Sequence, residues 1–216
     1  LSKLDIEDPD FARIQKITCG SHTLFLLDNG ALWGMGQNTS GQLGNGSNEN
    51  QSNPIRIFES EVADVAAGLN HTLVVKTDGS LWSFGANQDG QLGDGTFDST
   101  NQPKLVLEGE VKNVWAGAYH SLIIKNDNSL WSFGGNGSGQ LGNGSTQDTN
   151  IPGKVADNVS SVAAMGWHTV FINTSGELWG MGSNSSGQLG DGTTFNRHSP
   201  IKIIDEGEEL IACGGS

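Results

Sequence analysis

The chain has 216 residues, 32 of them glycine, and a formal net charge of −13. Affinity for nucleic acid rests on Lys and Arg neutralising phosphates, so 24 acidic against 11 basic residues argue against DNA, RNA or an anionic membrane as the main partner. No apolar stretch approaches the ~20 residues of a membrane span, and no charged-then-apolar signal segment opens the sequence. Short apolar runs between Gly, Asn, Asp and Ser clusters indicate an all-β protein.

The sequence repeats itself at intervals of 48 or 49 residues. Each copy has a histidine, a tryptophan eleven residues later, and a Gly-Gln-Leu-Gly-(Asn/Asp)-Gly run. These landmarks are His22, His71, His120 and His168; Trp33, Trp82, Trp131 and Trp179; and residues 41–46, 90–95, 139–144 and 187–192. A period of ~40–50 residues with several short strands is typical of a propeller blade. We therefore predict a β-propeller with blade repeats at about 12–60, 61–109, 110–157 and 158–205, and the start of the next at 206–216.

In the second copy we predict strands at about 62–67, 71–77, 81–86 and 103–108, which make one four-stranded blade. The second strand of each copy is apolar on successive residues, so both of its faces should be buried between neighbouring blades. A tight turn follows, whose critical position carries Gly30, Gly79, Asn128 and Gly176. Since Gly and Asn adopt positive φ at low cost, this pattern predicts a left-handed turn residue.

The remaining recurrent residues are interpreted as structural. The tryptophan of the third strand should fill the gap between blades. In the glycine-rich run the Leu should reach the core, while Asn and Gln side chains bond to backbone groups that lie off any strand. Cys19 and Cys213 hold corresponding positions, where other copies carry Ala67 or Met165. We interpret both as small buried residues, and a disulfide or a thiol function is the alternative.

No catalytic set is visible in the sequence. Four histidines at one repeat position could suggest a metal ring or a general base, but a side chain used in every blade is better explained by one structural job, such as bonding to the neighbouring backbone. Neither a Ser/His/Asp set nor a zinc spacing occurs. We therefore predict no enzyme activity, no cofactor and no metal.

Candidate binding residues lie where the copies differ while the frame stays fixed. The segment just before each recurrent histidine is such a place, and the four segments should meet on one propeller face near its axis. They contain Ser21, Leu69, Asn70, Ala118, Tyr119, Gly166 and Trp167. Tyr119 and Trp167 are the first candidates, because Tyr and Trp are favoured anchors of protein interfaces. Trp115 stands where the second and fourth copies have Ala66 and Ala163, and its role is left open between packing and binding.

Residues 67–95 carry the run Ala-Gly-X-Asn-His-Thr-Leu-Val-Val-Lys-Thr-Asp-Gly-Ser-Leu-Trp-Ser-Phe-Gly, followed by Gly-Gln-Leu-Gly-Asp-Gly. This run resembles the repeat of the regulator of chromosome condensation family, and the resemblance extends from about residue 12 to the end. It implies a seven-bladed propeller. Members of that family include an exchange factor for the small GTPase Ran, bacterial inhibitors of beta-lactamases, and bacterial proteins of unknown role.

Two departures from the family pattern guide the functional prediction. The even repeat spacing leaves no room for the wedge of the exchange factor, and no basic arm for chromatin is present. Four copies are also fewer than seven, which favours part of a longer propeller; a closed four-bladed ring and two chains completing one assembly are the alternatives. Either the remaining blades or a second copy would then be needed for closure.

The predicted function is a non-enzymatic protein-binding module that presents variable loops on one face of a rigid propeller. The alternatives are a guanine-nucleotide exchange factor for a small GTPase, a secreted inhibitor of an enzyme such as a beta-lactamase, and a scaffold attached to an enzyme domain outside this chain. Abundant Asn, Ser and Gly with little Lys favours a bacterial surface or secreted protein over a cytoplasmic one.

Overall fold

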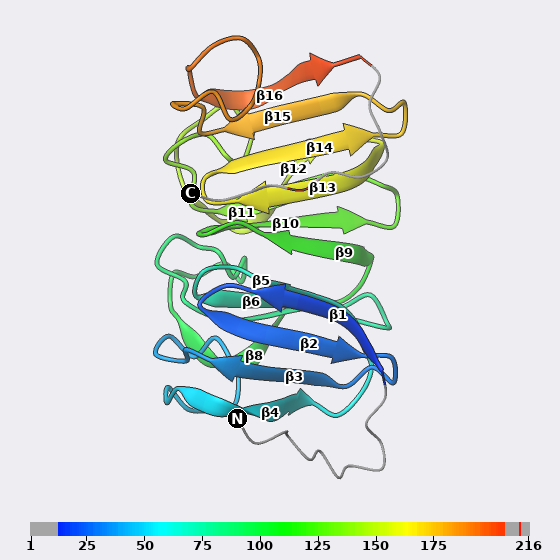
Figure 1. The fold of residues 1–216 in the computed structure, drawn as a ribbon, viewed down its shortest axis with the longest axis vertical. Coiled ribbons are helices and arrows are strands. Elements are labelled where there is room, and N and C mark those ends of the chain that lie inside the picture. Colours follow the sequence, from blue (N-terminus) through cyan, green and yellow to red (C-terminus); the bar gives the residue numbers. More distant parts are fainter. Residues whose placement is uncertain (1–12, 206–211, 213–216) are drawn as a thin grey trace.

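The computed structural model describes residues 13–205 and residue 212. In this part of the chain sixteen β-strands form four separate sheets of four antiparallel strands (Figure 1). The strands are β1 (Ile14–Cys19), β2 (His22–Leu27), β3 (Leu32–Gly36), β4 (Gln51–Phe58), β5 (Val62–Ala67), β6 (His71–Lys76), β7 (Leu81–Gly85), β8 (Thr100–Leu107), β9 (Val111–Ala116), β10 (His120–Lys125), β11 (Leu130–Gly134), β12 (Thr149–Ala156), β13 (Val159–Met165), β14 (His168–Asn173), β15 (Leu178–Gly182) and β16 (Arg197–Ile204). Each sheet is a meander of consecutive strands. The prediction of an all-β protein built from four-stranded blades is confirmed.

The four blades succeed one another around an axis lined by their first strands. β1 contacts β5, β5 contacts β9, and β9 contacts β13, so the innermost strand of each blade touches that of the next. Figure 1 shows the blades in succession along the longest axis, from the blue and cyan sheet of β1–β4 to the yellow and orange sheet of β13–β16. No helix in the described part of the chain is long and apolar enough to cross a bilayer.

The hydrophobic core lies between consecutive blades. Leu24 and Leu32 of the first blade are buried against Val65 and Phe84 of the second, and equivalent clusters join the second blade to the third and the third to the fourth. Burying one such side chain contributes ~1.5–3 kcal/mol. The second strand is accordingly buried on both faces in β6 and β10, as predicted, whereas Val170 of β14 is partly exposed on the side away from the third blade.

The turn between the second and third strands has the predicted left-handed residue. Gly30, Gly79 and Gly176 each have φ of 81°, and Asn128 has φ of 61°. The turn also joins neighbouring blades, because the carbonyls of Gly30, Gly79 and Asn128 accept hydrogen bonds from the first residue of the next blade, for example Val111 N at 3.0 Å.

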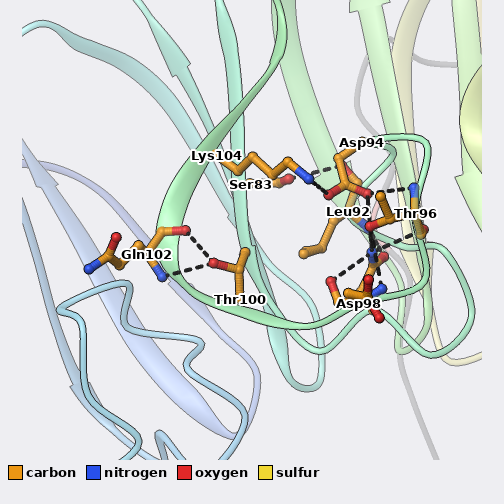
Figure 2. A network of polar contacts seen from close by, with 9 residues as sticks. Ser83, Leu92, Asp94, Thr96, Asp98, Thr100, Gln102 and Lys104 are labelled. Atoms are coloured by element: carbon orange, nitrogen blue, oxygen red, sulfur yellow. Dashed lines mark hydrogen bonds and ion pairs between the residues drawn. The ribbon is translucent and has the colours of Figure 1, made fainter.

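A buried asparagine organises each glycine-rich run. The Nδ2 of Asn87 donates to Asp94 Oδ1, Thr96 O and Asp98 O at 3.1–3.2 Å, while its Oδ1 accepts from Leu92 N at 2.9 Å. Figure 2 shows the same loop, in which Lys104 also reaches Asp94 at 2.5 Å. The pattern recurs at Asn38, Asn136 and Asn184, and the Leu of each run is at most 3% exposed. The prediction for this run is confirmed.

The tryptophans of the third strands are less buried than predicted. Trp82 packs at the margin of the core and is partly exposed, with its Nε1 donating to Ser80 Oγ at 3.0 Å. The ring that fills the space between blades is Phe84, two residues further on the same face. It packs so tightly against Gly44 of the preceding blade that a Cβ there would lie 2.8 Å from the ring. Position along β7 decides the difference, because Phe84 lies fully between the two sheets whereas Trp82 lies at the margin of the core between them.

Candidate functional site

The segments that precede the recurrent histidines meet beside the first strands, at one end of the axis. Backbone hydrogen bonds join them in order: Ser21 N donates to Leu69 O at 3.0 Å, Leu69 N to Ala118 O at 3.2 Å, and Ala118 N to Gly166 O at 3.0 Å. The spacing is close enough that a Cβ on Gly20 would lie 1.8 Å from Gly68 O. We call these four segments, residues 19–21, 67–70, 116–119 and 165–167, the axial face.

A pocket of about 520 Å³ opens at the axial face. Its walls are the first strands β1, β5, β9 and β13 together with the axial segments. Leu69, Trp115, Tyr119 and Trp167 all line it, and the lining is mostly apolar. The structure therefore brings four of the six predicted binding residues around one pocket.

The other two predicted residues lie beside this pocket and are held by the frame. Ser21 Oγ donates to Asn70 Oδ1 at 3.1 Å, and Gln42 Nε2 donates to the same oxygen at 3.3 Å. These bonds connect the first and second blades. Ser21 and Asn70 thus fix the position of the axial segments.

Tyr119 and Trp167 form a stacked aromatic pair at the pocket. Their ring centroids are 6.1 Å apart and their planes differ by 21°. Trp167 is 52% exposed, although burial of a large aromatic side chain such as tryptophan stabilises a core or an interface strongly. Trp115 also lines the pocket but packs against the core between the third and fourth blades, so it serves packing and lines the site at once.

Cys19 differs from its prediction. It is exposed and lines the pocket, because it is the last residue of β1 and lies where that strand reaches the axial face. Cys213 lies outside the described residues.

The recurrent histidines join neighbouring blades. The Nε2 of His22, His71 and His120 lies 2.7–3.0 Å from a hydroxyl of the next blade, on Thr72, Ser121 and Thr169 respectively. The structural role is as predicted, but the direct partner is a hydroxyl of the next blade, which in turn reaches a backbone carbonyl.

The protonation of these histidines follows from that chain of bonds. Each hydroxyl donates to the backbone carbonyl of a glutamine, as Thr72 does to Gln42 O at 2.7 Å, so its oxygen can only accept from the histidine Nε2–H. The Nδ1 atoms of His22, His71 and His120 are buried without a hydrogen-bond partner. Burial lowers the pKa of His22 to about 4 and the pKa of His71 and His120 to about 3, so these rings are neutral.

One inter-blade residue was missed by the sequence analysis. Asp64 on β5 is 6% exposed and accepts hydrogen bonds from Lys16 Nζ at 2.6 Å, Val114 N at 3.1 Å and Asn113 Nδ2 at 3.2 Å. It thereby joins three blades at the axis. The available signal was a lone carboxylate within the apolar run Val62–Ala67. Among the residues the structure describes, no group of three or more His, Cys, Asp or Glu side chains could hold a metal ion.

Repeated four-stranded meanders, cores between blades and a shared axis define a β-propeller protein, here with a pocket at one end of its axis. Residues 3–216 match the model of the RCC1-like domain, and the chain belongs to this family. The resemblance drawn from the repeat is confirmed at the level of the family.

Two solved propellers show the same arrangement. Human WBSCR16 is 26% identical with a TM-score of 0.82, covering 95% of this chain and 59% of that one. Prp20p from Saccharomyces cerevisiae is 24% identical with a TM-score of 0.84, covering 95% and 55%, and this likeness shows the fold alone. A Caenorhabditis elegans homolog of the X-linked retinitis pigmentosa GTPase regulator is 37% identical over 73 residues, 32% of this chain and 5% of that protein. The chain spans little more than half the length of the two propellers.

Proposed function

We propose that this chain is a non-enzymatic protein-binding module whose axial face is its docking site. The observation that carries the proposal is the stacked pair of Tyr119 and Trp167, with Trp167 half-exposed, beside a largely apolar pocket. Aromatic anchors at a concave site are the side chains that most often carry the binding energy of a protein interface. An exposed apolar site on a rigid frame is typical of a place where another protein docks.

The frame supports this function because it holds the axial segments still. Backbone hydrogen bonds join each segment to the next. The side chains of Ser21 and Gln42 also donate hydrogen bonds to Asn70, which join the first blade to the second. Segments fixed in advance lose little conformational entropy when a partner binds. The net charge of −13 also favours rapid encounter with a basic partner.

The absence of enzyme activity is part of the proposal and rests on the histidines. They are the recurrent candidates for a general base, yet His22, His71 and His120 already use their Nε2–H within the frame. Their Nδ1 atoms are buried, out of reach of a substrate. Each of these rings is therefore better suited to holding two blades together than to moving a proton.

Exchange of nucleotide on a small GTPase is the second candidate. The fold likeness to Prp20p favours it, since that protein's structure is reported together with its binding to Gsp1p and histones. The connections between third and fourth strands, residues 37–50, 86–99, 135–148 and 183–196, are equal in length and each is organised by a buried asparagine. None of them forms a projecting wedge, so exchange would need a wedge elsewhere in the propeller.

We further propose that closure of the ring takes more blades than these four. The chain spans 55–59% of the propellers it matches, and Val170 on the outer side of the fourth blade is partly exposed. We propose that further blades of the same propeller cover this face, with a second copy of the chain as the alternative. The enzyme-inhibitor role, the attached enzyme domain, and a bacterial surface or secreted origin stay predictions.

Site-specific photo-cross-linking tests the docking site. A benzophenone side chain at position 167 should yield a discrete adduct with a protein from the source cell, and the adduct should disappear when Tyr119→Ala is added. The control places the same group at Ser175, an exposed turn residue at the opposite end of the same blade. Equal adducts at both positions, or none at 167, would contradict the proposal.

A further inference from the structure

A second hollow, of about 410 Å³, lies beside the axial face. It is bounded by Tyr119 and Trp167 on one side and by the glycine-rich loops of the second and third blades on the other, with Asp89, Gly135, Gly137 and Asp148 among its lining. We call it the rim notch. The aromatic pair is thus shared between the axial pocket and the rim notch.

Two glycines peculiar to the third copy open this notch. Position 135 corresponds to Gln37, Ala86 and Ser183 in the other copies, and position 137 to Thr39, Gln88 and Ser185. Neither glycine is among those with positive φ, so the backbone conformation does not require them. A Cβ at Gly135 would lie 3.3 Å from Tyr119 Cβ and 3.5 Å from Asp89 Cβ, and one at Gly137 would meet open space. What the two glycines provide is room between the aromatic pair and Asp89.

The notch also gathers two carboxylates that the other copies lack. Asp89 stands where they have Ser40, Ser138 and Ser186, and Asp148 stands where they have Asn50, Ser99 and Asn196. Asp148 accepts a hydrogen bond from Asn136 N at 2.7 Å, and neither carboxylate has a cationic partner within residues 13–205. Burial and the charge of Asp148 raise the pKa of Asp89 above its usual range. A cation in the notch would relieve this repulsion.

From this arrangement we infer that the rim notch binds an arginine side chain of the protein partner, with the guanidinium stacked on the Tyr119–Trp167 pair and hydrogen-bonded to Asp89. The inference rests on the proposed function and names the chemistry of its partner. A guanidinium is planar, carries its charge at all relevant pH values, stacks on aromatic faces and donates paired hydrogen bonds to a carboxylate. Aromatic faces attract cations as well. A lysine ammonium has no plane to stack, so arginine fits the notch better.

Binding of a defined probe tests the inference on the full chain. The peptide acetyl-Gly-Arg-Gly-amide is titrated while the indole ¹⁵N–H signal of Trp167, identified by its loss in Trp167→Phe, is followed by NMR. We expect a saturable shift with the arginine peptide. The matched peptide with citrulline, which has the same shape without the charge, should bind at least about tenfold more weakly. Equal binding of the two peptides would overturn the inference.

Variants taken from the chain's own repeats locate the probe. Asp89→Ser installs the residue of the other three copies, and Gly137→Gln installs that of the second; each should weaken arginine-peptide binding at least about tenfold. Asp98→Ser removes the same charge from an exposed position of the second blade and should change binding less than about twofold. If Asp89→Ser and Asp98→Ser weakened arginine-peptide binding equally, the loss would reflect the lower net charge of the chain and not a contact in the notch, and the inference would be overturned.

The experiments distinguish failure of the axial docking site from failure of the arginine-binding rim notch. If the cross-link at position 167 forms but the arginine and citrulline peptides bind alike, the notch assignment is wrong and the axial docking site stands. If the arginine peptide binds through Asp89 but no protein is cross-linked at 167, the preference of the notch for a guanidinium stands and the protein-docking function is wrong.

Discussion

Phe84 and Trp82 share one strand face but differ in burial. Phe84 is 0% exposed between the first two blades, whereas Trp82 packs at the margin and is partly exposed. Removing a fully buried ring costs ~3–5 kcal/mol, because contacts are lost and a cavity remains. We therefore expect Phe84→Ala to lower the free energy of unfolding by that amount and Trp82→Ala to lower it by less, as measured by urea denaturation. A larger loss for Trp82→Ala would show that Trp82, and not Phe84, contributes most to holding the two blades together.

The aromatic pair of the axial face should matter little for stability. Trp167 is 52% exposed, and substitutions at such sites change the free energy of unfolding by less than ~1 kcal/mol. We expect Trp167→Ala to leave the thermal midpoint nearly unchanged, measured by circular dichroism beside Phe84→Ala as the destabilised reference. A loss as large as that of Phe84→Ala would mean that Trp167 is a structural residue, and the docking site would have to be sought elsewhere.

At the scale of strands and turns, the links between blades come from side chains about 49 residues apart. His71 of β6 bonds to Ser121 of β10 and is neutral, with a pKa lowered by burial from 6.5 to about 3. An unfolded chain takes up protons on such a histidine below pH 6.5 while the folded chain does not. Stability is therefore present above pH 6.5 and is lost as the pH falls towards 3, by about 1.4 kcal/mol per pH unit for each such histidine.

This linkage predicts a shallower pH dependence for His71→Gln. The free energy of unfolding, measured in urea at pH 7, 6 and 5, should fall less steeply than in the unaltered chain. His198→Gln changes an exposed histidine outside the repeat register and serves as the control, with an unchanged slope. An unchanged slope in His71→Gln as well would show that this histidine is not neutral in the fold.

The strands, turns and glycine-rich runs could be predicted because each is encoded locally and repeated four times. Asn128 among three glycines at one turn position already implied positive φ, and the buried asparagine of each run implied bonds to its own loop. That the axial segments meet on one face could be predicted from the register of the repeat. By contrast, the hydroxyl partner of His71, the three-blade contacts of Asp64 and the notch opened by Gly135 depend on which residues of neighbouring blades touch, and no local pattern contains that information.

At the scale of the whole molecule the four blades form an arc with two outer sides. Ile17 of the first blade is 59% exposed, whereas its counterparts in the inner blades, Val65 and Val114, are fully buried. Val170 of the fourth blade is partly exposed, whereas its counterparts Leu73 and Leu122 are fully buried. Exposed apolar blade faces favour association or the addition of further repeats. The axial face is carried by this arc, so its shape in solution determines how a partner can approach.

The claim that the four blades form an open arc of a larger propeller is tested most directly by the solution mass and shape of the 216-residue chain. Both can be measured by light scattering together with small-angle X-ray scattering. We expect either an associated species or an elongated, open particle whose scattering profile agrees with four blades in an arc. A compact monomer with the profile of a closed four-bladed ring would contradict the assignment of these blades as part of a larger propeller, and with it the proposal that further blades cover the exposed outer side of the fourth blade.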